Sequence, residues 1–347
     1  MNIAIIGTGS WGTALALVLN ENGHRVRCWT NVEQQVIDIK NNGENKDYLP
    51  GIAIPSNIVI STDYASTIEN AEIIVSAVPS QVTRNVIAEL KPLIATMNPV
   101  WVTVSKGIEN KTYKRITEVI TEVGHVDPNK IVAMSGPSHA EEVARKIPTA
   151  IVSASKNLSS AKIVQKAFMN KYFRVYSNDD VIGVELGGAL KNIIALAAGI
   201  CDGAGFGDNT KAALITRGLV EINRLGVEMG ARSDTFAGLS GMGDLVVTCM
   251  SKHSRNRHVG EQIGKGRPLQ EILDEMNMVA EGVKTTISAF EIAQSRNVEM
   301  PITEQIYYVL FENKPPQEAM VDLMTRASKM EDATRSAVIF APPAAST

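Results

Sequence analysis

Lys191 lies in a stretch of the chain that carries almost no other charge. Residues 186–198 read LGGALKNIIALAA, the pattern of a buried helix. Because removing an ammonium group from water is costly, burial lowers the pKa of a lysine toward values suited to acid–base catalysis. The alternative is that Lys191 lies on the one wet face of the helix, with its amine in solvent. We take Lys191 as the first candidate for a catalytic residue.

A glycine motif near the start of the chain indicates a nucleotide site. Gly7, Gly9 and Gly12 have the spacing Gly-x-Gly-x-x-Gly and follow an apolar run that begins at Ile3. In such motifs the glycines allow a tight turn, close approach of a pyrophosphate, and close packing of helix on strand. A helical pattern and a second strand at 25–29 complete a βαβ unit. We predict a dinucleotide bound at the helix N-terminus, although the spacing alone would also suit a structural turn.

A second glycine-rich stretch, GLSGMGDL at 238–245, lacks the Gly-Lys-Ser/Thr ending of a phosphate-binding P-loop. Its Asp244 precedes an apolar segment. This carboxylate could cap a helix, or it could accept a hydrogen bond from a substrate hydroxyl.

The stretch SKHSRNRH at 251–258 combines cationic side chains with residues that cap helices. An arginine, an amide and a helix N-terminus together suit a small phosphate group, and a solvated charged loop is the alternative. His253 and His258 are five positions apart, not the four that align metal ligands on a helix, so we expect no metal.

Composition narrows the class of protein. A length of 347 residues favours two domains, and a net charge of −3 gives no reason to expect nucleic acid as a partner. The three cysteines, 28, 201 and 249, lack the spacing of a zinc site or disulfide framework, which favours a reducing cytoplasm. No signal peptide and no uninterrupted apolar run of about 18 residues is present, so we expect no membrane insertion.

Strands and helices alternate in the first half of the chain, and only helical patterns follow from residue 181. We predict an α/β fold: an N-terminal Rossmann-type, mainly parallel, doubly wound sheet followed by an all-helical C-terminal domain. The dinucleotide-binding domain would span 1–180, the helical substrate-binding and catalytic domain 181–335, and a disordered tail 336–347. Beyond the first two strands, we expect strands at 71–78, 100–105, 130–135 and 149–155.

An ordered set of motifs resembles the bacterial NAD(P)-dependent glycerol-3-phosphate dehydrogenases over nearly all of residues 1–335. The motifs are GTGSWG at 7–12, SKGIE at 105–109, SGPSHA at 135–140, ELGGALKN at 185–192, GMGDL at 241–245, SRN at 254–256 and AEG at 280–282.

The resemblance implies that the protein interconverts dihydroxyacetone phosphate and sn-glycerol 3-phosphate by hydride transfer with NAD(H) or NADP(H), supplying phospholipid synthesis. It implies that Lys191 is the general acid/base. Substrate-binding residues would be Lys106, Gly136, Ser138, Lys191, Asp244, Ser254, Arg255 and Asn256. Cofactor-binding residues would be Gly7, Gly9, Ser10, Trp11, Gly12, Lys106, Ala140, Arg255, Val279 and Glu281. It also predicts a homodimer.

One position departs from the usual pattern. NAD-binding folds place an acidic residue about 20 positions past the glycines to bind the ribose 2′-hydroxyl, and an arginine there suits a 2′-phosphate. This chain has Thr30 and Asn31 instead, and Glu33 lies further into the following turn. The preference between NAD and NADP is therefore open.

Two other functions compete with this interpretation. One is another two-domain dehydrogenase that acts on a hydroxy acid or sugar acid, and the other is a nicotinamide-binding sensor without activity.

Overall fold

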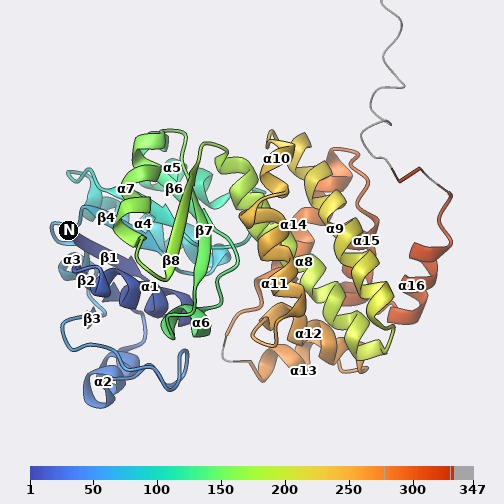
Figure 1. Ribbon diagram of the computed structural model, residues 1–347, viewed down its shortest axis with the longest axis horizontal. Coiled ribbons are helices and arrows are strands. Elements are labelled where there is room, and N and C mark those ends of the chain that lie inside the picture. The colour runs from blue at the N-terminus through green and yellow to red at the C-terminus, as the bar shows by residue number, and fades with distance from the viewer. Residues whose placement is uncertain (277, 329, 332–347) are drawn as a thin grey trace, which may run out of the picture.

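An open sheet and a helical bundle lie side by side in the computed structural model, which describes residues 1–276, 278–328 and 330–331 (Figure 1). The strands are β1 (Asn2–Ile6), β2 (Arg25–Trp29), β3 (Val59–Ser61), β4 (Ile73–Ser76), β5 (Val100–Thr103), β6 (Ile131–Ser135), β7 (Thr149–Ala154) and β8 (Phe173–Asn178). The predicted tail at 336–347 lies outside the described residues.

Helices cover the sheet and then form the second half of the molecule. Those of the first half are α1 (Ser10–Glu21), α2 (Glu33–Asn42), α3 (Tyr64–Ile68), the short turn η1 (Ser80–Val82), α4 (Thr83–Ile94), α5 (Ile116–Gly124), η2 (Pro128–Lys130), α6 (Ala140–Ala144) and α7 (Leu158–Phe168). The helices that follow are α8 (Val181–Ala204), α9 (Asp208–Glu228), α10 (Ser233–Phe236), η3 (Leu239–Gly243), α11 (Asp244–Met250), α12 (Arg255–Gly264), α13 (Leu269–Asp274), α14 (Glu281–Ser295), α15 (Pro301–Phe311) and α16 (Pro316–Met324).

The sheet confirms the predicted fold class. Its strand order is β3-β2-β1-β4-β5-β6-β7-β8, with every neighbouring pair parallel except β6 and β7. The order reverses direction between β1 and β4, and in such sheets ligands bind outside the carboxyl ends of the strands at that point. The loops after β1, β4, β5 and β6 all begin at this edge, because these four strands run parallel.

Two strands were not predicted from the sequence. β3 has only three residues, and its Val59 is exposed, so it offers little apolar signal. β8 is an edge strand in which Arg174 and Tyr176 face solvent between buried residues. Such alternation with charged residues is typical of an edge strand and weakens the apolar pattern.

The glycine motif packs as the sequence predicts. Gly7 has φ +111°, and a Cβ on Gly12 would lie 1.9 Å from the carbonyl oxygen of Gly7. The start of α1 therefore lies against the turn after β1, a position that only glycine permits. Gly9, by contrast, faces open space, so its backbone is accessible to a ligand.

Helix α8 is the core of the helical half, with α9, α11, α12 and α14 packed around it. It is long and apolar enough to cross a membrane by length and composition, but 94% of its most apolar window is buried inside the protein. Small residues allow neighbouring backbones to meet, since a Cβ on Gly199 would lie 2.0 Å from the carbonyl oxygen of Arg257. At its start, Asp180 caps the helix by accepting a hydrogen bond from the backbone N–H of Gly183 (2.9 Å).

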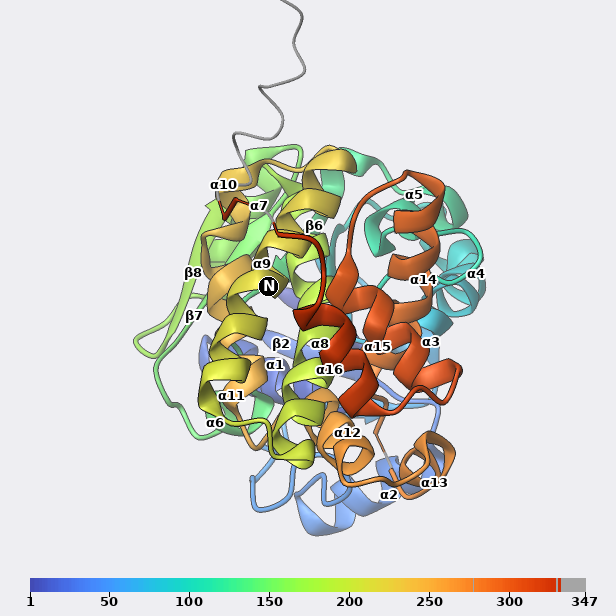
Figure 2. The ribbon, with the colours of Figure 1, turned by 90° about the vertical axis from the view of Figure 1, so that its right-hand side faces the viewer.

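Contacts also tie the bundle to the sheet region. Glu185 of α8 accepts hydrogen bonds from the guanidinium of Arg115 (2.6 Å) and from the backbone N–H of Thr117 (2.9 Å) at the start of α5. Viewed from the bundle end, α9, α15 and α16 lie on the side away from the sheet (Figure 2). The site described below lies on the opposite side of α8, where the two halves meet.

A buried carboxylate joins α9 to α15. Glu221 is 3% exposed and accepts hydrogen bonds from the backbone N–H groups of Ile302 (2.6 Å) and Thr303 (3.1 Å). It thereby caps α15, whose own N-cap residue, Met300, makes no side-chain cap. Burial raises the pKa of Glu221 to about 7, although these hydrogen bonds act to lower it.

Glu221→Gln should make stability less dependent on pH. Because the folded pKa lies above the usual 4.5, the folded state holds the proton more tightly, and stability falls as pH rises from about 4.5 to about 7. The loss reaches about 3 kcal/mol above pH 7, on the order of 1.4 kcal/mol per pKa unit. The thermal unfolding midpoint of the variant, relative to that of wild type, should therefore be higher at pH 8 than at pH 5.

Glu228→Gln, on the exposed surface of the same helix, is the matched control and should leave the pH dependence of the midpoint unchanged. If the unfolding midpoints of Glu221→Gln and wild type differed by the same amount at both pH values, the raised pKa of Glu221 would be contradicted.

Candidate active site

Three charged side chains meet where the helical bundle faces the carboxyl edge of the sheet. Lys191 comes from the middle of α8, Asp244 begins α11, and Lys106 lies in the loop after β5. The ammonium of Lys191 donates to Oδ1 of Asp244, and that of Lys106 donates to Oδ2 at 2.7 Å. One carboxylate thus holds two ammonium groups that are far apart in the sequence.

Burial and mutual charge shift the pKa values of this cluster. Lys191 is only 5% exposed, so the alternative of a lysine on a wet helix face does not hold. Burial lowers the pKa of Lys191 to about 7, the charge of Lys106 acts in the same direction, and Asp244 opposes both. Burial alone would raise the pKa of Asp244, but the two ammonium groups lower it, so this residue stays ionised. Lys191 can therefore gain and lose a proton near neutral pH.

Thr248 and Asn192 complete the surroundings of the lysines. Thr248 Oγ1 accepts a hydrogen bond from the Lys191 ammonium (2.7 Å) and donates to the carbonyl oxygen of Asp244 (2.6 Å). Sequence reasoning missed Thr248, although its position four residues after Asp244 places both on one face of α11. Asn192 Nδ2 donates to the carbonyl oxygen of Lys106 (3.0 Å), which fixes the loop that carries this lysine.

The loop after β6 forms the next wall of the site. Gly136 has φ +148°, and a Cβ there would lie 2.9 Å from Cα of Ile151, so a side chain is excluded. Its carbonyl oxygen accepts hydrogen bonds from the Lys106 ammonium (3.0 Å) and from Ser138 Oγ (2.8 Å). Ala140 begins α6 directly afterwards.

His139, in the same loop, is a further residue to which sequence reasoning assigned no role. Its Nε2 is buried and has no hydrogen-bond partner within the residues that the structure describes, and its ring lies 5.7 Å from that of His253, which precedes α12. Burial and the charges of Lys191 and Lys106 lower the pKa of His139 to about 4. The imidazole is therefore neutral at physiological pH and adds no third positive charge to the cluster.

The start of α12 presents polar groups to the same region. Ser254 is the N-cap and accepts a hydrogen bond from the backbone N–H of Arg257 (3.2 Å), while Asn256 Oδ1 accepts from the backbone N–H of Gly282 (2.9 Å). Both residues are buried, which does not fit a freely solvated loop. Arg255 is exposed and has no ion-pair or hydrogen-bond partner among the described residues, so its guanidinium is free to bind an anion.

The glycine turn fits a dinucleotide. Among the described residues, no side chain caps the N-terminus of α1, so its backbone N–H groups can bind phosphate oxygens. Ser10 Oγ donates to Sδ of Met278 (3.1 Å), which brings the segment before α14 over the turn. Trp11 packs against Phe173 of β8 at a ring separation of 6.5 Å, and Val279, the residue after Met278, is 48% exposed.

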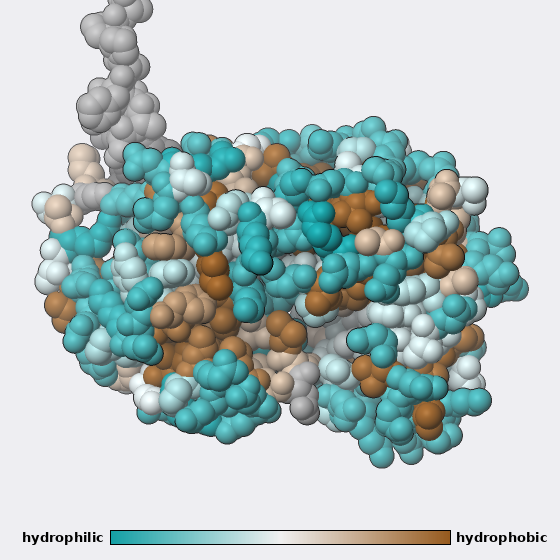
Figure 3. All heavy atoms as spheres, turned by 180° about the vertical axis from the view of Figure 1, so that it is seen from behind, coloured by the Kyte–Doolittle hydropathy of each residue, from teal (hydrophilic) through white to brown (hydrophobic). Residues whose placement is uncertain are grey.

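Glu281 links the bundle to the same edge. Its Oε1 accepts a hydrogen bond from the backbone N–H of Ser80 (2.6 Å), at the start of the helix after β4. Its Oε2 is buried and has no hydrogen-bond partner in the described part of the chain, and burial raises the pKa of this carboxyl group. A buried polar atom without a partner is costly, so a donor from a bound cofactor would stabilise it. Seen from behind, the surface is hollowed between the half that contains the sheet and the helical half (Figure 3).

The end of β2 carries neither of the usual signals for cofactor preference. Thr30 Oγ1 donates to Gln35 Oε1 (2.5 Å), which also accepts from Thr8 Oγ1 (2.7 Å), so these side chains satisfy one another. Asn31 and Glu33 are exposed. Among the described residues, no three His, Cys, Asp or Glu side chains are grouped so that they could hold a metal ion.

Comparison with known proteins agrees with this geometry. Residues 2–161 match the family model described as NAD-dependent glycerol-3-phosphate dehydrogenase N-terminus, and residues 180–321 match the corresponding C-terminus. The chain belongs to this family. A glycerol-3-phosphate dehydrogenase [NAD(P)+] of Thermoanaerobacter sp. is 54% identical over 95% of this chain and 99% of its own length. One from Geobacillus thermodenitrificans is 51% identical over 95% of this chain and 96% of its own length.

Solved structures of the family have the same fold. The glycerol-3-phosphate dehydrogenase of Coxiella burnetii, 41% identical, superposes with a TM-score of 0.89 over 93% of this chain and 98% of its own. D-mandelate dehydrogenase, at 13% identity and a TM-score of 0.59, covers 92% of this chain and shares the fold alone. The predicted NAD(P) dependence, the oxidoreductase class and the family are thus confirmed.

Asn31→Arg should shift cofactor preference toward NADPH. A guanidinium at the end of β2 would pair with the 2′-phosphate, and a charge-assisted hydrogen bond of this kind contributes about 1.5–3 kcal/mol, or roughly tenfold to a hundredfold in affinity. Calorimetric titration with NADH and NADPH measures the ratio of the two dissociation constants. Asn31→Gln, which lengthens the side chain without adding charge, should leave that ratio near its wild-type value, and an unchanged ratio in Asn31→Arg would show that the 2′ position lies elsewhere.

Proposed function

We propose that this family member interconverts dihydroxyacetone phosphate and sn-glycerol 3-phosphate with NAD(H) or NADP(H), the reaction implied by the names of its relatives. The observation that supports it most is the buried Lys191, held by Asp244 beside a site that could bind phosphate. In the cell the product would serve phospholipid synthesis in the cytoplasm. The two halves, 1–180 and 181–335, would act as cofactor and substrate domains.

Lys191 is the group that moves the proton. When bound, the nicotinamide supplies a hydride to the central carbon of the ketone, or accepts it from the alcohol. Negative charge develops on the carbonyl oxygen during reduction, and the Lys191 ammonium stabilises that charge and donates a proton to it. In oxidation the neutral amine accepts the proton. With a pKa of about 7, both forms are available at physiological pH.

Asp244 and Lys106 position this proton donor. The Asp244 carboxylate accepts from both ammonium groups, so it orients Lys191 and keeps Lys106 at the carboxyl edge of the sheet. The positive charge of Lys106 would attract the anionic substrate and, together with Gly136 and Ser138, align it. Thr248 holds the Lys191 ammonium from the other side.

The start of α12 is the proposed phosphate site. Ser254, Arg255 and Asn256 would bind the phosphate through a hydroxyl, a guanidinium and an amide, aided by the N-terminal dipole of this ten-residue helix. The free guanidinium of Arg255 supports this arrangement.

The cofactor would lie along the edge from the glycine turn to α12. We assign its binding to Gly7, Gly9, Ser10, Trp11, Gly12, Lys106, Ala140, Arg255, Val279 and Glu281. The free N-terminus of α1 supports binding of the pyrophosphate at the glycine turn. The unpaired Oε2 of Glu281 supports binding of another part of the cofactor near the start of α14. We also propose a homodimer, on the resemblance to the family.

The competing functions have less support. A hydroxy-acid dehydrogenase shares only the fold with this chain, as the 13% identity to D-mandelate dehydrogenase illustrates. A sensor without activity would leave unexplained why a lysine is buried with a matched carboxylate, which costs several kcal/mol of desolvation.

The function is tested by mixing the purified protein with dihydroxyacetone phosphate and NADH or NADPH and following the loss of reduced-nicotinamide absorbance. Oxidation of a cofactor only with the phosphorylated ketone is expected, because the site at α12 recognises the phosphate. Unphosphorylated dihydroxyacetone is the control. Tight cofactor binding without turnover of the phosphorylated ketone would overturn the assignment.

Lys191→Ala should lower kcat by about 10²- to 10⁴-fold, the contribution typical of a general acid or base. Affinity for NADH, measured by calorimetry, should stay close to wild type, because Lys191 acts on the substrate oxygen. Lys265→Ala, which removes a half-exposed lysine at the end of α12, is the matched control and should retain full activity. Normal turnover by Lys191→Ala would refute the mechanism.

A further inference from the structure

The half-buried imidazole of His139 lies at the site, but the proposed mechanism does not use it. The backbone carbonyl of His139 accepts hydrogen bonds from the N–H groups of Glu142 and Val143 (both 3.1 Å), which begins α6. The imidazole itself makes no capping hydrogen bond to this helix. The backbone therefore holds the residue in place, while the ring remains available for another contact.

The ring borders two parts of the site. It lies 5.7 Å from the ring of His253, the residue before Ser254, which is the N-cap of α12. The charges of Lys191 and Lys106 also act on the imidazole, so it lies within electrostatic range of the acid–base cluster. His139 is thus near both the start of α12 and the proton donor.

One nitrogen of this ring has no partner. Nε2 of His139 is buried and makes no hydrogen bond within the part of the chain that the structure describes. A buried nitrogen of this kind has given up its hydrogen bonds to water without replacing them, which is costly. A ligand that offers a partner atom recovers that cost, so the unpaired nitrogen points to a ligand contact.

The protonation state of the ring decides which ligand atom it suits. Burial lowers the pKa of His139 to about 4, and the charges of Lys191 and Lys106 act in the same direction. The acidic side chains of Glu141 and Asp244 act against them. The imidazole is therefore neutral at physiological pH, with one N–H donor and one acceptor nitrogen. The oxygens of a phosphate dianion only accept, so they pair with the tautomer that carries its proton on Nε2.

A neutral donor suits this position better than a third cation. A further positive charge near Lys191 would lower the pKa of this lysine and move it away from physiological pH. The N–H of a neutral ring has no such effect. Its hydrogen bond to an anionic oxygen is also stronger than one between two neutral groups. A phosphate group can therefore be held close to the proton donor without disturbing the titration of that donor.

We propose that the Nε2–H of His139 donates a hydrogen bond to the phosphate group of the substrate. His139 thereby joins the residues of the phosphate site at the start of α12. This proposal rests on the proposed function and adds a substrate-binding residue to it. His139 would set the affinity for the phosphorylated ketone and take no part in proton transfer.

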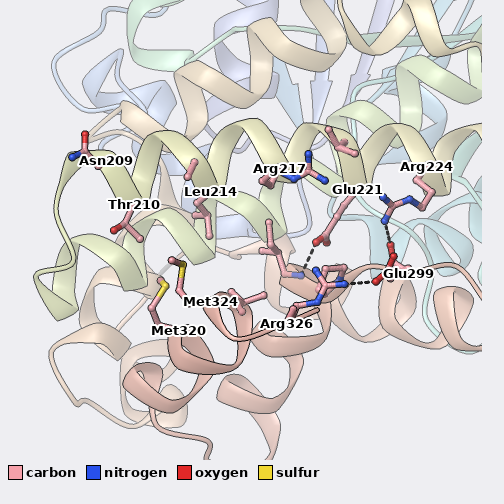
Figure 4. A pocket seen from close by; sticks show the side chains of 15 residues that line it. Asn209, Thr210, Leu214, Arg217, Glu221, Arg224, Glu299, Met320, Met324 and Arg326 are labelled. Carbon is pink, nitrogen blue, oxygen red and sulfur yellow. Dashed lines mark hydrogen bonds and ion pairs between the residues drawn. The ribbon is translucent and has the colours of Figure 1, made fainter. Parts of the chain in front are cut away.

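Another group of cations suits a phosphate less well. Arg217, Arg224 and Arg326 line a groove among α9, α15 and α16 (Figure 4). Arg326 forms an ion pair with Glu299, and Arg224 donates to the carbonyl oxygen of the same residue. An anion in this groove would have to compete with Glu299 for both arginines. Arg217 is exposed and provides a control for phosphate bound at this second place.

His139→Phe tests the proposal, because phenylalanine keeps a flat ring and removes the N–H. The KM for dihydroxyacetone phosphate should rise at least about tenfold, the effect of losing a hydrogen bond to a charged group. The kcat should stay within about twofold of wild type, because proton transfer is untouched. His139→Gln, which returns an N–H donor, should restore KM to within about threefold of wild type. His258→Phe, the same change at an exposed histidine of α12, is the matched control and should leave KM unchanged.

Inorganic phosphate provides a readout that does not depend on turnover. In NADH-saturated protein with isotopically labelled histidine, phosphate should shift the nuclear magnetic resonance signal of His139 Nε2, assigned through His139→Phe. The signals of His258 should stay in place. Calorimetric titration should give a dissociation constant for phosphate at least about tenfold higher in His139→Phe than in wild type. Arg217→Gln should leave this constant unchanged.

The outcomes separate this proposal from the proposed function. An unchanged KM and an unchanged affinity for phosphate in His139→Phe would overturn the contact. Equal losses in His139→Phe and His139→Gln would also overturn it, because the shape of the ring rather than its N–H would then be needed. If the protein failed to turn over dihydroxyacetone phosphate while phosphate still shifted the His139 signal, the proposed function would fail and the phosphate contact would stand.

Discussion

The carboxylate of Asp244, buried between the ammonium groups of Lys106 and Lys191, is the interaction on which the rest of the structure depends. A buried lysine without a counter-ion would lose its proton, and a buried carboxylate without cations would gain one. Together, the Asp244 carboxylate stays ionised and the pKa of Lys191 falls no further than about 7, at a desolvation cost that only a well-packed fold can offset. The cluster therefore requires α8, α11 and the loop after β5 to be held at fixed distances.

The fold meets this requirement through close backbone packing. Glycines on α8 and α12 let the helices touch, and Glu185 ties the start of α8 to the sheet region through Arg115. The parallel order of β1, β4, β5 and β6 brings their loops to one edge, so residues from the first 140 positions face α8, α11 and α12. The glycine turn after β1 and the loop that carries Lys106 thus lie at one edge of the sheet, which Lys191 of α8 faces.

The sequence predicted those features that depend on residues close together in the chain. The spacing of three glycines predicted the turn and its close helix, and the apolar surroundings of Lys191 predicted its burial, both of which the structure confirms. Asp244 remained ambiguous between a cap and a ligand, because its partners lie 53 and 138 positions away. Its contacts are with the two lysines, and Gly243 precedes it at the cap position of α11.

Other features depend on tertiary contacts that no local pattern encodes. The hydrogen bond between Ser10 and Met278 spans 268 positions, and the capping of α15 by Glu221 spans about 80. In the edge strand β8, the exposed Arg174 and Tyr176 alternate with buried residues, so the apolar pattern of this strand is as weak as that of a loop.

The titration of Lys191 itself tests the central claim most directly. In protein with isotopically labelled lysine, nuclear magnetic resonance would follow the Lys191 ammonium against pH, with Lys191→Arg used to assign the signal. The account predicts a midpoint near 7, with Asp244→Asn shifting it lower because the attractive carboxylate is lost. A midpoint near the ordinary lysine value of about 10.4 would contradict it, since Lys191 could then not exchange a proton at physiological pH.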